Sequence, residues 1–260
     1  MSGTRLRKRL GQHHLRSGAL CRPVLDFLHP GGRTVLEIGP GGGVLTRELL
    51  RAGARVLSCE LDPEWAFRLA RDPALRPVSL VLGDALDLAW ERLPRGTLVA
   101  GNLPYGISTV LIGRLLARSE GVARAAFLVQ LEVALRLAAG PGDPDYGALS
   151  VLTQARAAVT VLGRVARGSF RPVPKVGGAF VGLVRRPPPL PASRMPEFAA
   201  TVRLAFARRR KTLRNALAAG WGRERTEEVL GALGIERRVR SEQLTLEDFV
   251  AIHRRHQLLG

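Results

Sequence analysis

Short apolar runs alternate with amphipathic stretches through the first half of the chain. Apolar runs of strand length occupy residues 34–38, 55–60, 78–82, 97–101 and 125–130. Segments with apolar positions at helical spacing lie between or after them, at residues 44–51, 63–71, 107–117 and 131–139. This alternation is typical of a parallel sheet with helices on both faces. The pattern therefore predicts an α/β fold with a Rossmann-like sheet.

Beyond residue 139 the pattern changes. Apolar runs follow one another without long helices at residues 147–155, 158–162 and 179–184. We expect antiparallel strands there that complete the sheet. The proline-rich segment 186–191 then interrupts the pattern. It is typical of a stiff interdomain linker, and a ligand for a proline-binding module is the less favoured alternative.

The last part of the chain has a helical pattern. Residues 195–260 show helical periodicity, few β-branched runs and glycines at the expected helix ends. These features indicate a small helical domain. We therefore predict two domains, at residues 1–187 and 188–260, with a basic N-terminal segment at residues 1–16.

The charge of the chain restricts its partners. The net charge is +18 and the isoelectric point is near 11.6. Such an excess attracts polyanions and gives salt-dependent binding. It favours a nucleic-acid partner over an acidic protein or a membrane surface.

Composition excludes several other classes of protein. A hydrophobic content of 46% excludes a disordered chain, and charges interrupt every apolar run before it reaches the ~20 residues of a membrane span. The only cysteines, Cys21 and Cys59, fit no metal or redox spacing, and the five histidines form no coherent metal set. We expect a monomeric cytoplasmic protein without a metal or a membrane partner.

A glycine-rich turn follows the first expected strand. The sequence Glu37-Ile38-Gly39-Pro40-Gly41-Gly42-Gly43 leaves a strand and opens a helix. Its glycines would let the backbone approach a ligand closely, although tight structural turns look the same. Glu60 ends the second strand, where a carboxylate binds ribose hydroxyls in nucleotide-binding α/β folds. For the nearby Asp62, a helix N-cap before Pro63 is an ordinary role.

Three further features favour S-adenosylmethionine over a dinucleotide. Glu37 offers a carboxylate to the ammonium end of the donor. Asp84 ends the third strand, where it would accept a hydrogen bond from the adenine amino group. The tetrad Asn-Leu-Pro-Tyr, residues 102–105, ends the fourth strand. These elements, in this order and each after its own strand, predict a methyl-donor site.

The tetrad suits a flat base that carries an amino group. The Asn102 side-chain oxygen and the Leu103 carbonyl would accept both N–H bonds of the amine. Pro104 stiffens the turn, and Tyr105 would cover the base face. The lone pair of the amine would then face a sulfonium methyl, so methyl transfer needs mainly proximity and alignment. We expect no catalytic histidine or aspartate, because the proton becomes acidic only once the new bond forms.

At these residues the chain resembles the ribosomal RNA adenine N6,N6-dimethyltransferase family, and within it the bacterial KsgA type. Residues 11–15, Gly-Gln-His-His-Leu, are similar to the family's GQNFL, and residues 170–176 to its F-x-P-P-P-K-V. Residues 209–215, Arg-Arg-Lys-Thr-Leu-Arg-Asn, resemble the family's RRKTLRN. The last motif points to the small-subunit enzyme over relatives that methylate large-subunit rRNA and confer macrolide resistance.

The resemblance implies a class I S-adenosylmethionine-dependent methyltransferase sheet followed by a helical rRNA-binding domain. It implies dimethylation of two adjacent adenosines in the 3′-terminal hairpin of small-subunit rRNA, with a role in subunit biogenesis. Phe170 would form the wall opposite Tyr105 around an extracted base. The expected donor-binding residues are Gln12, His14, Leu15, Glu37, Gly39, Gly41, Gly43, Glu60, Leu61, Asp84, Ala85 and Asn102. The expected RNA-binding residues are Arg208, Arg209, Arg210, Lys211 and Arg214.

The chain departs from the family pattern at a few positions. His13 and His14 replace Asn and Phe in the first motif, and Val173 replaces a proline. None of these changes removes a group that the chemistry needs, but the histidine pair bears on donor or substrate affinity. A non-catalytic ribosome assembly factor is the second hypothesis. DNA adenine methylation is less favoured, because such enzymes typically carry D/N-P-P-Y tetrads.

Overall fold

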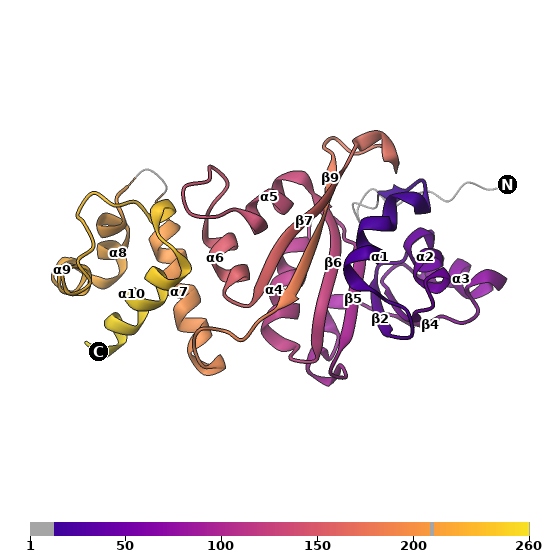
Figure 1. Ribbon diagram of the computed structural model, residues 1–260, viewed down its shortest axis with the longest axis horizontal. Coiled ribbons are helices and arrows are strands. Elements are labelled where there is room, and N and C mark those ends of the chain that lie inside the picture. The colour runs from indigo at the N-terminus through magenta and orange to yellow at the C-terminus, as the bar shows by residue number, and fades with distance from the viewer. Residues whose placement is uncertain (1–12, 209–210, 260) are drawn as a thin grey trace. The chain divides into compact units, whose positions relative to one another are not determined.

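The computed structural model describes residues 13–208 and 211–259 (Figure 1). Contacts divide the chain into two compact units. The first runs to Ala134 and includes Ala158–Arg185, and the second consists of Leu135–Ala157 and Arg186–Gly260. Gln12, Arg209 and Arg210, three of the expected site residues, lie outside the described residues, as does most of the basic N-terminal segment.

The first unit is built on a seven-stranded sheet with the order β4-β3-β2-β5-β6-β9-β7. Strands β2 to β6 pair in parallel, and β9 pairs antiparallel with β6. This arrangement confirms the α/β fold and the five expected parallel strands. The strands are β2 Thr34–Ile38, β3 Arg55–Glu60, β4 Ser79–Leu82, β5 Thr97–Asn102, β6 Val122–Gln130, β7 Ala157–Val165 and β9 Gly178–Arg185.

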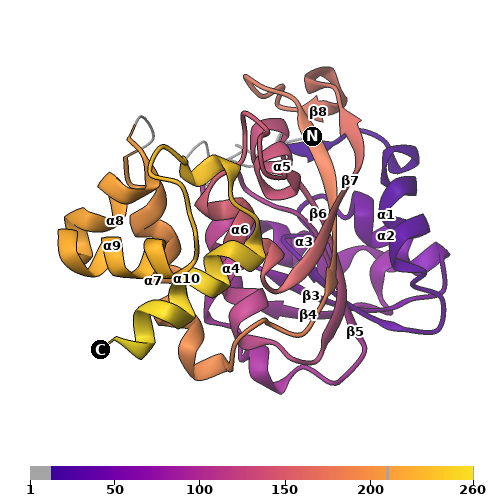
Figure 2. The ribbon, with the colours of Figure 1, turned by 60° about the vertical axis from the view of Figure 1, so that its left-hand side comes forward.

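Helices cover both faces of this sheet. In both views α1 and α2 lie on one side of the sheet and α4 on the other (Figures 1 and 2). The helices are α1 Arg22–Leu28, α2 Val44–Arg51, α3 Pro63–Arg71 and α4 Ser108–Arg118. Helix α5, Leu131–Ala138, begins in the first unit and ends in the second. Short 3-10 helices are η2 Gly18–Cys21, η3 Pro73–Leu75, η4 Ala85–Asp87, η5 Trp90–Arg92 and η6 Arg167–Ser169. Asp62 caps α3 by accepting a hydrogen bond from the backbone N–H of Glu64 at 2.9 Å.

The central strands are apolar on both faces because both faces are covered. Leu98, Val99 and Ala100 of β5 are fully buried. Side chains from the helices and from the strands form one core cluster, which includes Leu28 and Leu49. Since parallel strands end at the same edge of a sheet, the polar residues at the carboxyl ends of β2, β3, β4 and β5 come together.

A separate two-stranded ribbon joins the N-terminal end of the described chain to a distant segment. Strand β1 (His14–Leu15) pairs antiparallel with β8 (Phe170–Arg171). The backbone N–H of Arg16 continues the ribbon by donating to the carbonyl of Ser169 at 2.9 Å. Leu15 and Phe170 from the two strands are both buried in the core cluster of this unit.

The prediction of a strand at residues 147–155 is wrong, because this segment forms helix α6 (Ala148–Gln154). Val151 and Ala155 are buried in the core of the second unit, and Ala148 and Leu152 pack against the same cluster. These four positions have the spacing of one helical face. The two later runs do form strands, within β7 and β9.

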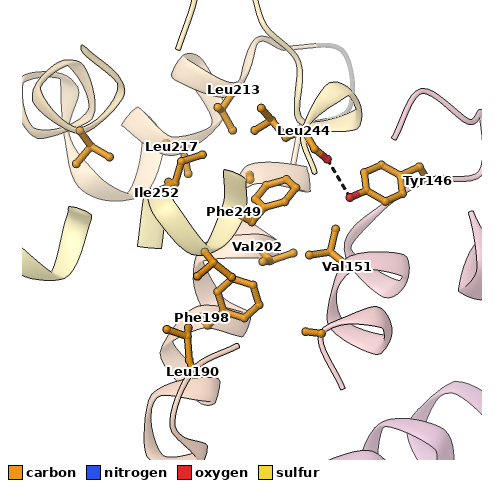
Figure 3. Packing of buried hydrophobic residues seen from close by; sticks show 14 of the residues in the cluster. Tyr146, Val151, Leu190, Phe198, Val202, Leu213, Leu217, Leu244, Phe249 and Ile252 are labelled. Atoms are coloured by element: carbon orange, nitrogen blue, oxygen red, sulfur yellow. Dashed lines mark hydrogen bonds between the residues drawn. The ribbon is translucent and has the colours of Figure 1, made fainter. Parts of the chain in front are cut away.

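The second unit contains the expected C-terminal helices, α7 Met195–Phe206, α8 Leu213–Trp221, α9 Arg223–Ala232 and α10 Leu246–Leu258, with η7 Ala192–Arg194 and η8 Ser241–Gln243. Phe198, Leu217 and Phe249 form the centre of its core (Figure 3). Leu190, from the proline-rich segment, is buried in the same cluster. The segment therefore packs against helices of this unit. None of the helices in the described part of the chain is both long and apolar enough to cross a membrane.

One hydrogen bond in this core is testable by a conservative substitution. The hydroxyl of Tyr146 donates to the carbonyl of Leu244 at 2.9 Å, and the site is buried (Figure 3). Tyr146→Phe leaves that carbonyl without its donor, so the free energy of unfolding should fall by ~1–2 kcal/mol in equilibrium denaturation. Leu258→Ala, at a largely exposed position, is the control and should change the free energy by less than about 0.5 kcal/mol. Equal effects of the two substitutions would contradict this assignment.

Candidate active site

One cavity lies at the carboxyl ends of β2, β3, β4 and β5. It encloses about 400 Å³, within the usual range for a site that binds a small molecule. Most of the residues expected at the methyl-transfer site line it, and they come from five separate parts of the sequence. These residues are His14, Leu15, Glu37, Gly39, Glu60, Leu61, Asp84, Ala85, Asn102, Leu103, Pro104 and Tyr105.

Among the described residues, three that were expected at the methyl-transfer site do not line the cavity. Gly41 and Gly43 have positive φ angles of 51° and 73° and therefore act through the shape of the turn. Phe170 is fully buried in the core cluster. Its role as the second wall of a base clamp stays a prediction, and in the structure described here its ring is packed away from the cavity.

Several lining residues were not predicted as site residues. They are His13, Ile38, Pro40, Gly42, Val44, Leu45, Cys59, Gly83, Gly106 and Ile107. Most stand directly beside a predicted residue at a strand end, so adjacency was the available signal. His13 was noted only as a departure from the family motif.

The glycine turn is shaped to let another segment pass close to it. A Cβ atom built on Gly41 would lie 2.4 Å from Cε1 of His14, so a side chain at this position would collide with the imidazole. That imidazole also packs against the Trp65 ring, with centroids 4.7 Å apart. Its Nε2 atom is buried and makes no hydrogen bond within the described residues. Burial lowers the pKa of His14, which favours the neutral ring.

Glu60 links the end of β3 to the glycine turn. One carboxylate oxygen accepts from the backbone N–H of Gly41 at 2.9 Å, and the other accepts from the backbone N–H of Asp62 at 2.9 Å. Burial raises the pKa of Glu60, and these two hydrogen bonds oppose the rise. The carboxylate thus orders two loops of the cavity wall.

Glu37 is the most deeply buried acid of the site. Its side chain is 1% exposed and accepts a hydrogen bond from the hydroxyl of Ser58 at 3.3 Å. Burial raises the pKa of Glu37 to about 7, and the nearby negative charge of Glu60 acts in the same direction. The cavity therefore contains an acid that changes its charge near neutral pH.

Asp84 lies just after the carboxyl end of β4. Its carboxylate accepts from the backbone N–H of Leu86 at 2.8 Å and caps the short helix η4. This bond fixes the orientation of the carboxylate at the cavity wall. A carboxylate has further lone pairs that can accept from a ligand amino group.

The tetrad is held by bonds to its two neighbouring segments. The backbone N–H of Leu103 donates to the carbonyl of Leu128 on β6 at 3.0 Å. The side-chain amide of Asn102 donates to the carbonyl of His13 at 2.6 Å. The Tyr105 ring lies 5.5 Å from the His13 ring, centroid to centroid, at an interplanar angle of 34°. Burial raises the pKa of Tyr105, whose hydroxyl has no partner within the described residues.

The expected RNA-binding residues lie in the second unit. Arg208 and Lys211 are exposed, and the backbone N–H of Lys211 donates to the carbonyl of Arg208 at 2.9 Å. Arg214 instead pairs with Glu227, so its charge is already compensated. A second basic segment adjoins this turn, since the backbone N–H of Leu213 donates to the carbonyl of Val239 at 2.9 Å. Two exposed arginines, Arg237 and Arg238, directly precede Val239.

The geometry can be compared with known proteins. A family model described as ribosomal RNA adenine dimethylase matches residues 3–257. The chain belongs to the ribosomal RNA adenine dimethylase family. The sequence resemblance is therefore confirmed across nearly the whole chain.

Curated relatives and solved structures agree with membership of the ribosomal RNA adenine dimethylase family. The chain is 42% identical over 254 residues to ribosomal RNA small subunit methyltransferase A of Rubrobacter xylanophilus, covering 96% of this chain and 95% of that protein. It is 39% identical over 259 residues to the protein of the same name from Aromatoleum aromaticum, covering 97% of this chain and 94% of that protein. Among solved structures, 23S rRNA methyltransferase ErmE matches with a TM-score of 0.70 and 29% identity, covering 94% of this chain and 99% of ErmE. A dimethyladenosine transferase from Plasmodium falciparum matches the fold with a TM-score of 0.77 at 23% identity, covering 92% and 96% of the two chains.

As a ribosomal RNA adenine dimethylase, the protein is an S-adenosylmethionine-dependent enzyme that methylates adenine in rRNA. When bound, S-adenosylmethionine supplies an electrophilic methyl group on a sulfonium centre. The residues present fit this group: the cavity combines three acidic side chains at strand ends with a turn whose close approach to His14 excludes a Cβ atom at Gly41. The tetrad lines the same cavity.

The raised pKa of Glu37 makes a prediction about stability. A carboxyl whose pKa is about 7 in the folded protein and 4.5 when unfolded binds its proton more tightly in the folded state. Its contribution to stability is therefore present at low pH and lost as the pH rises from about 4.5 to 7. Glu37→Gln should remove that loss, so the variant should match the natural protein near pH 4 and exceed it by up to ~3 kcal/mol near pH 8.

Urea denaturation at several pH values measures this difference directly. Glu224→Gln, an exposed position on α9, is the matched control and should follow the natural protein at every pH. Parallel curves for Glu37→Gln and the natural protein would show that folding does not raise the pKa of Glu37.

Proposed function

We propose that this enzyme dimethylates the N6 amines of two adjacent adenosines in the 3′-terminal hairpin of small-subunit rRNA. The substrate would be the immature small subunit in the cytoplasm, and the enzyme would act as a monomer without a metal. The single observation that carries the proposal is the position of the tetrad: Asn102 and Tyr105 line the same cavity as the three acids Glu37, Glu60 and Asp84. The relatives at about 40% identity that are named for the small subunit support this choice of rRNA.

The tetrad would act mainly by orienting the target amine. The amide of Asn102 has its NH₂ group engaged by the carbonyl of His13, which leaves its oxygen to accept one N–H of the adenine amine. The carbonyl of Leu103 would accept the other. With both hydrogens held, the nitrogen lone pair is directed at the methyl group, and alignment supplies the rate enhancement.

The donor would be held by the acids at the strand ends. Glu37 would bind the ammonium end, Glu60 the ribose hydroxyls and Asp84 the adenine amino group. Glu60 already orders the turn through Gly41, so the donor would meet a preformed wall. A second methyl transfer requires the monomethylated amine to bind with one N–H fewer, which the Asn102 oxygen alone can satisfy.

Large-subunit rRNA is the alternative substrate, since ErmE, with 29% identity, shares the fold. Small and large subunits purified from a strain that lacks the gene are the decisive substrates. Incubation with the enzyme and a labelled donor should place dimethyladenosine in small-subunit rRNA, located by mass spectrometry of rRNA fragments. Recovery of the modification in large-subunit rRNA alone would overturn the proposal.

Asn102→Ala tests the role of the tetrad. It removes the amide that would accept from the target amine, so methyl transfer should fall below detection in an assay with labelled donor. Binding to the small subunit, measured by sedimentation, should remain nearly unchanged because the exposed basic residues of the second unit are intact. Loss of both properties together would show that Asn102 has a structural role.

The exposed basic turn makes a separate prediction about salt. If Arg208 and Lys211 contact phosphates, then the double variant with alanine at both positions should reduce the slope of log affinity against log salt by about 2. Binding of rRNA fragments between low and moderate salt measures this slope. Arg92→Ala, an exposed arginine of the first unit, is the control and should leave the slope unchanged. An unaltered slope in the double variant would show that Arg208 and Lys211 do not contact the RNA phosphates.

A further inference from the structure

The orientation of the Asn102 amide is set by a backbone group far away in sequence. Its Nδ2 atom donates to the carbonyl oxygen of His13 at 2.6 Å, across 89 residues. A carbonyl oxygen can only accept a hydrogen bond. The NH₂ end of the amide must therefore face His13, and the amide oxygen remains for another donor.

The carbonyl of His13 needs support of its own, because this residue precedes β1 and is not part of that strand. Its side chain supplies that support. The Nδ1 atom of His13 lies 2.8 Å from the carbonyl oxygen of Pro172, one residue beyond the last pair of the β1–β8 ribbon, His14 with Arg171. Since this carbonyl accepts, Nδ1 carries the hydrogen. The side chain thus extends the ribbon by one more bond.

The imidazole ring also occupies a defined place in the cavity. It lines the cavity beside the Tyr105 ring, at the centroid distance of 5.5 Å given above. The same residue therefore contacts the two functional members of the tetrad, Asn102 through its main chain and Tyr105 through its ring. His13 is thus held between Pro172, which directly follows β8, and the tetrad.

We propose that His13 is a positioning residue for methyl transfer. The His13 side chain donates a hydrogen bond to the carbonyl of Pro172. This bond fixes the main-chain carbonyl of His13, which in turn orients the Asn102 amide so that its oxygen faces the target amine. The property required at position 13 is a side-chain hydrogen-bond donor rather than an imidazole. Asparagine, which stands here in the related GQNFL motif, has such a donor in its NH₂ group. This proposal rests on the adenine N6 methylation proposed above.

Two nearly isosteric substitutions test the proposal. His13→Asn retains a donor for the carbonyl of Pro172, whereas His13→Asp presents a carboxylate that cannot donate and is repelled by the carbonyl. The readout is the single-turnover rate of methyl transfer to small subunits at saturating donor and substrate. We expect His13→Asp to lower this rate by ~10- to 100-fold, as misplaced reacting groups do, and His13→Asn to restore it to near the natural value.

Donor affinity and thermal stability are measured on the same variants. Both should stay near the natural values in His13→Asn and His13→Asp, so that the effect falls on the rate and not on folding or donor binding. His29→Asn, an exposed histidine with φ of 48°, is a matched control and should leave every quantity unchanged, because asparagine tolerates this backbone conformation.

Three results would overturn the proposal. Equal loss of rate in His13→Asn and His13→Asp would mean that the imidazole itself is needed, as a proton acceptor for example. Loss of donor affinity in proportion to rate would make His13 a donor ligand. An unchanged rate in His13→Asp would remove it from the reaction. Absence of methylation of small subunits by the natural enzyme is a different outcome, which would refute the proposed substrate and leave the role of His13 to be measured on the rRNA that is methylated.

Discussion

The candidate active site depends on a buried carboxylate that holds two loops together. Glu60 accepts hydrogen bonds from the backbone of Gly41 in the glycine turn and of Asp62 before α3. Burial of a carboxylate is unfavourable unless its oxygens are hydrogen-bonded, and here the chain supplies both donors. The turn can then take its positive φ angles, α3 can begin at Pro63, and the wall between them keeps one shape. The other site residues are arranged around this wall.

The cavity differs in charge from the molecule as a whole. The chain as a whole carries a net charge of +18, yet the acidic residues Glu37, Glu60 and Asp84 line the cavity. A net positive charge attracts an anionic polymer over long distances, while the carboxyl groups of the cavity favour a cationic ligand. The same protein can therefore bind two ligands of opposite charge without a conflict between them.

Much of this arrangement can be predicted from the sequence, because the end of a strand can be recognised within a short stretch of residues. Apolar runs that stop at Glu37, Glu60 and Asn102 predict both the strands and the residues at the site, and the topology of a parallel sheet brings them together. The apolar run at residues 147–155 predicts a strand because no long helical pattern accompanies it, whereas burial of one face shows that it forms α6. The salt bridge of Arg214 with Glu227 and the bond of Asn102 to His13 join positions with no pattern in common. Such contacts depend on tertiary packing, which periodicity does not encode.

The pairing of β1 with β8 has a consequence for the time at which the enzyme becomes active. Residues 14 and 171 must both be present before the ribbon forms, and the contact of His13 with Pro172 closes a loop of 159 residues. Closing so long a loop is slow and follows the formation of more local structure. During synthesis the sheet from β2 to β6 can assemble while β8 is still within the ribosome. The nascent chain would thus carry a nearly complete donor wall but an unfinished tetrad, and catalytic competence would arise late, after the chain has passed residue 172.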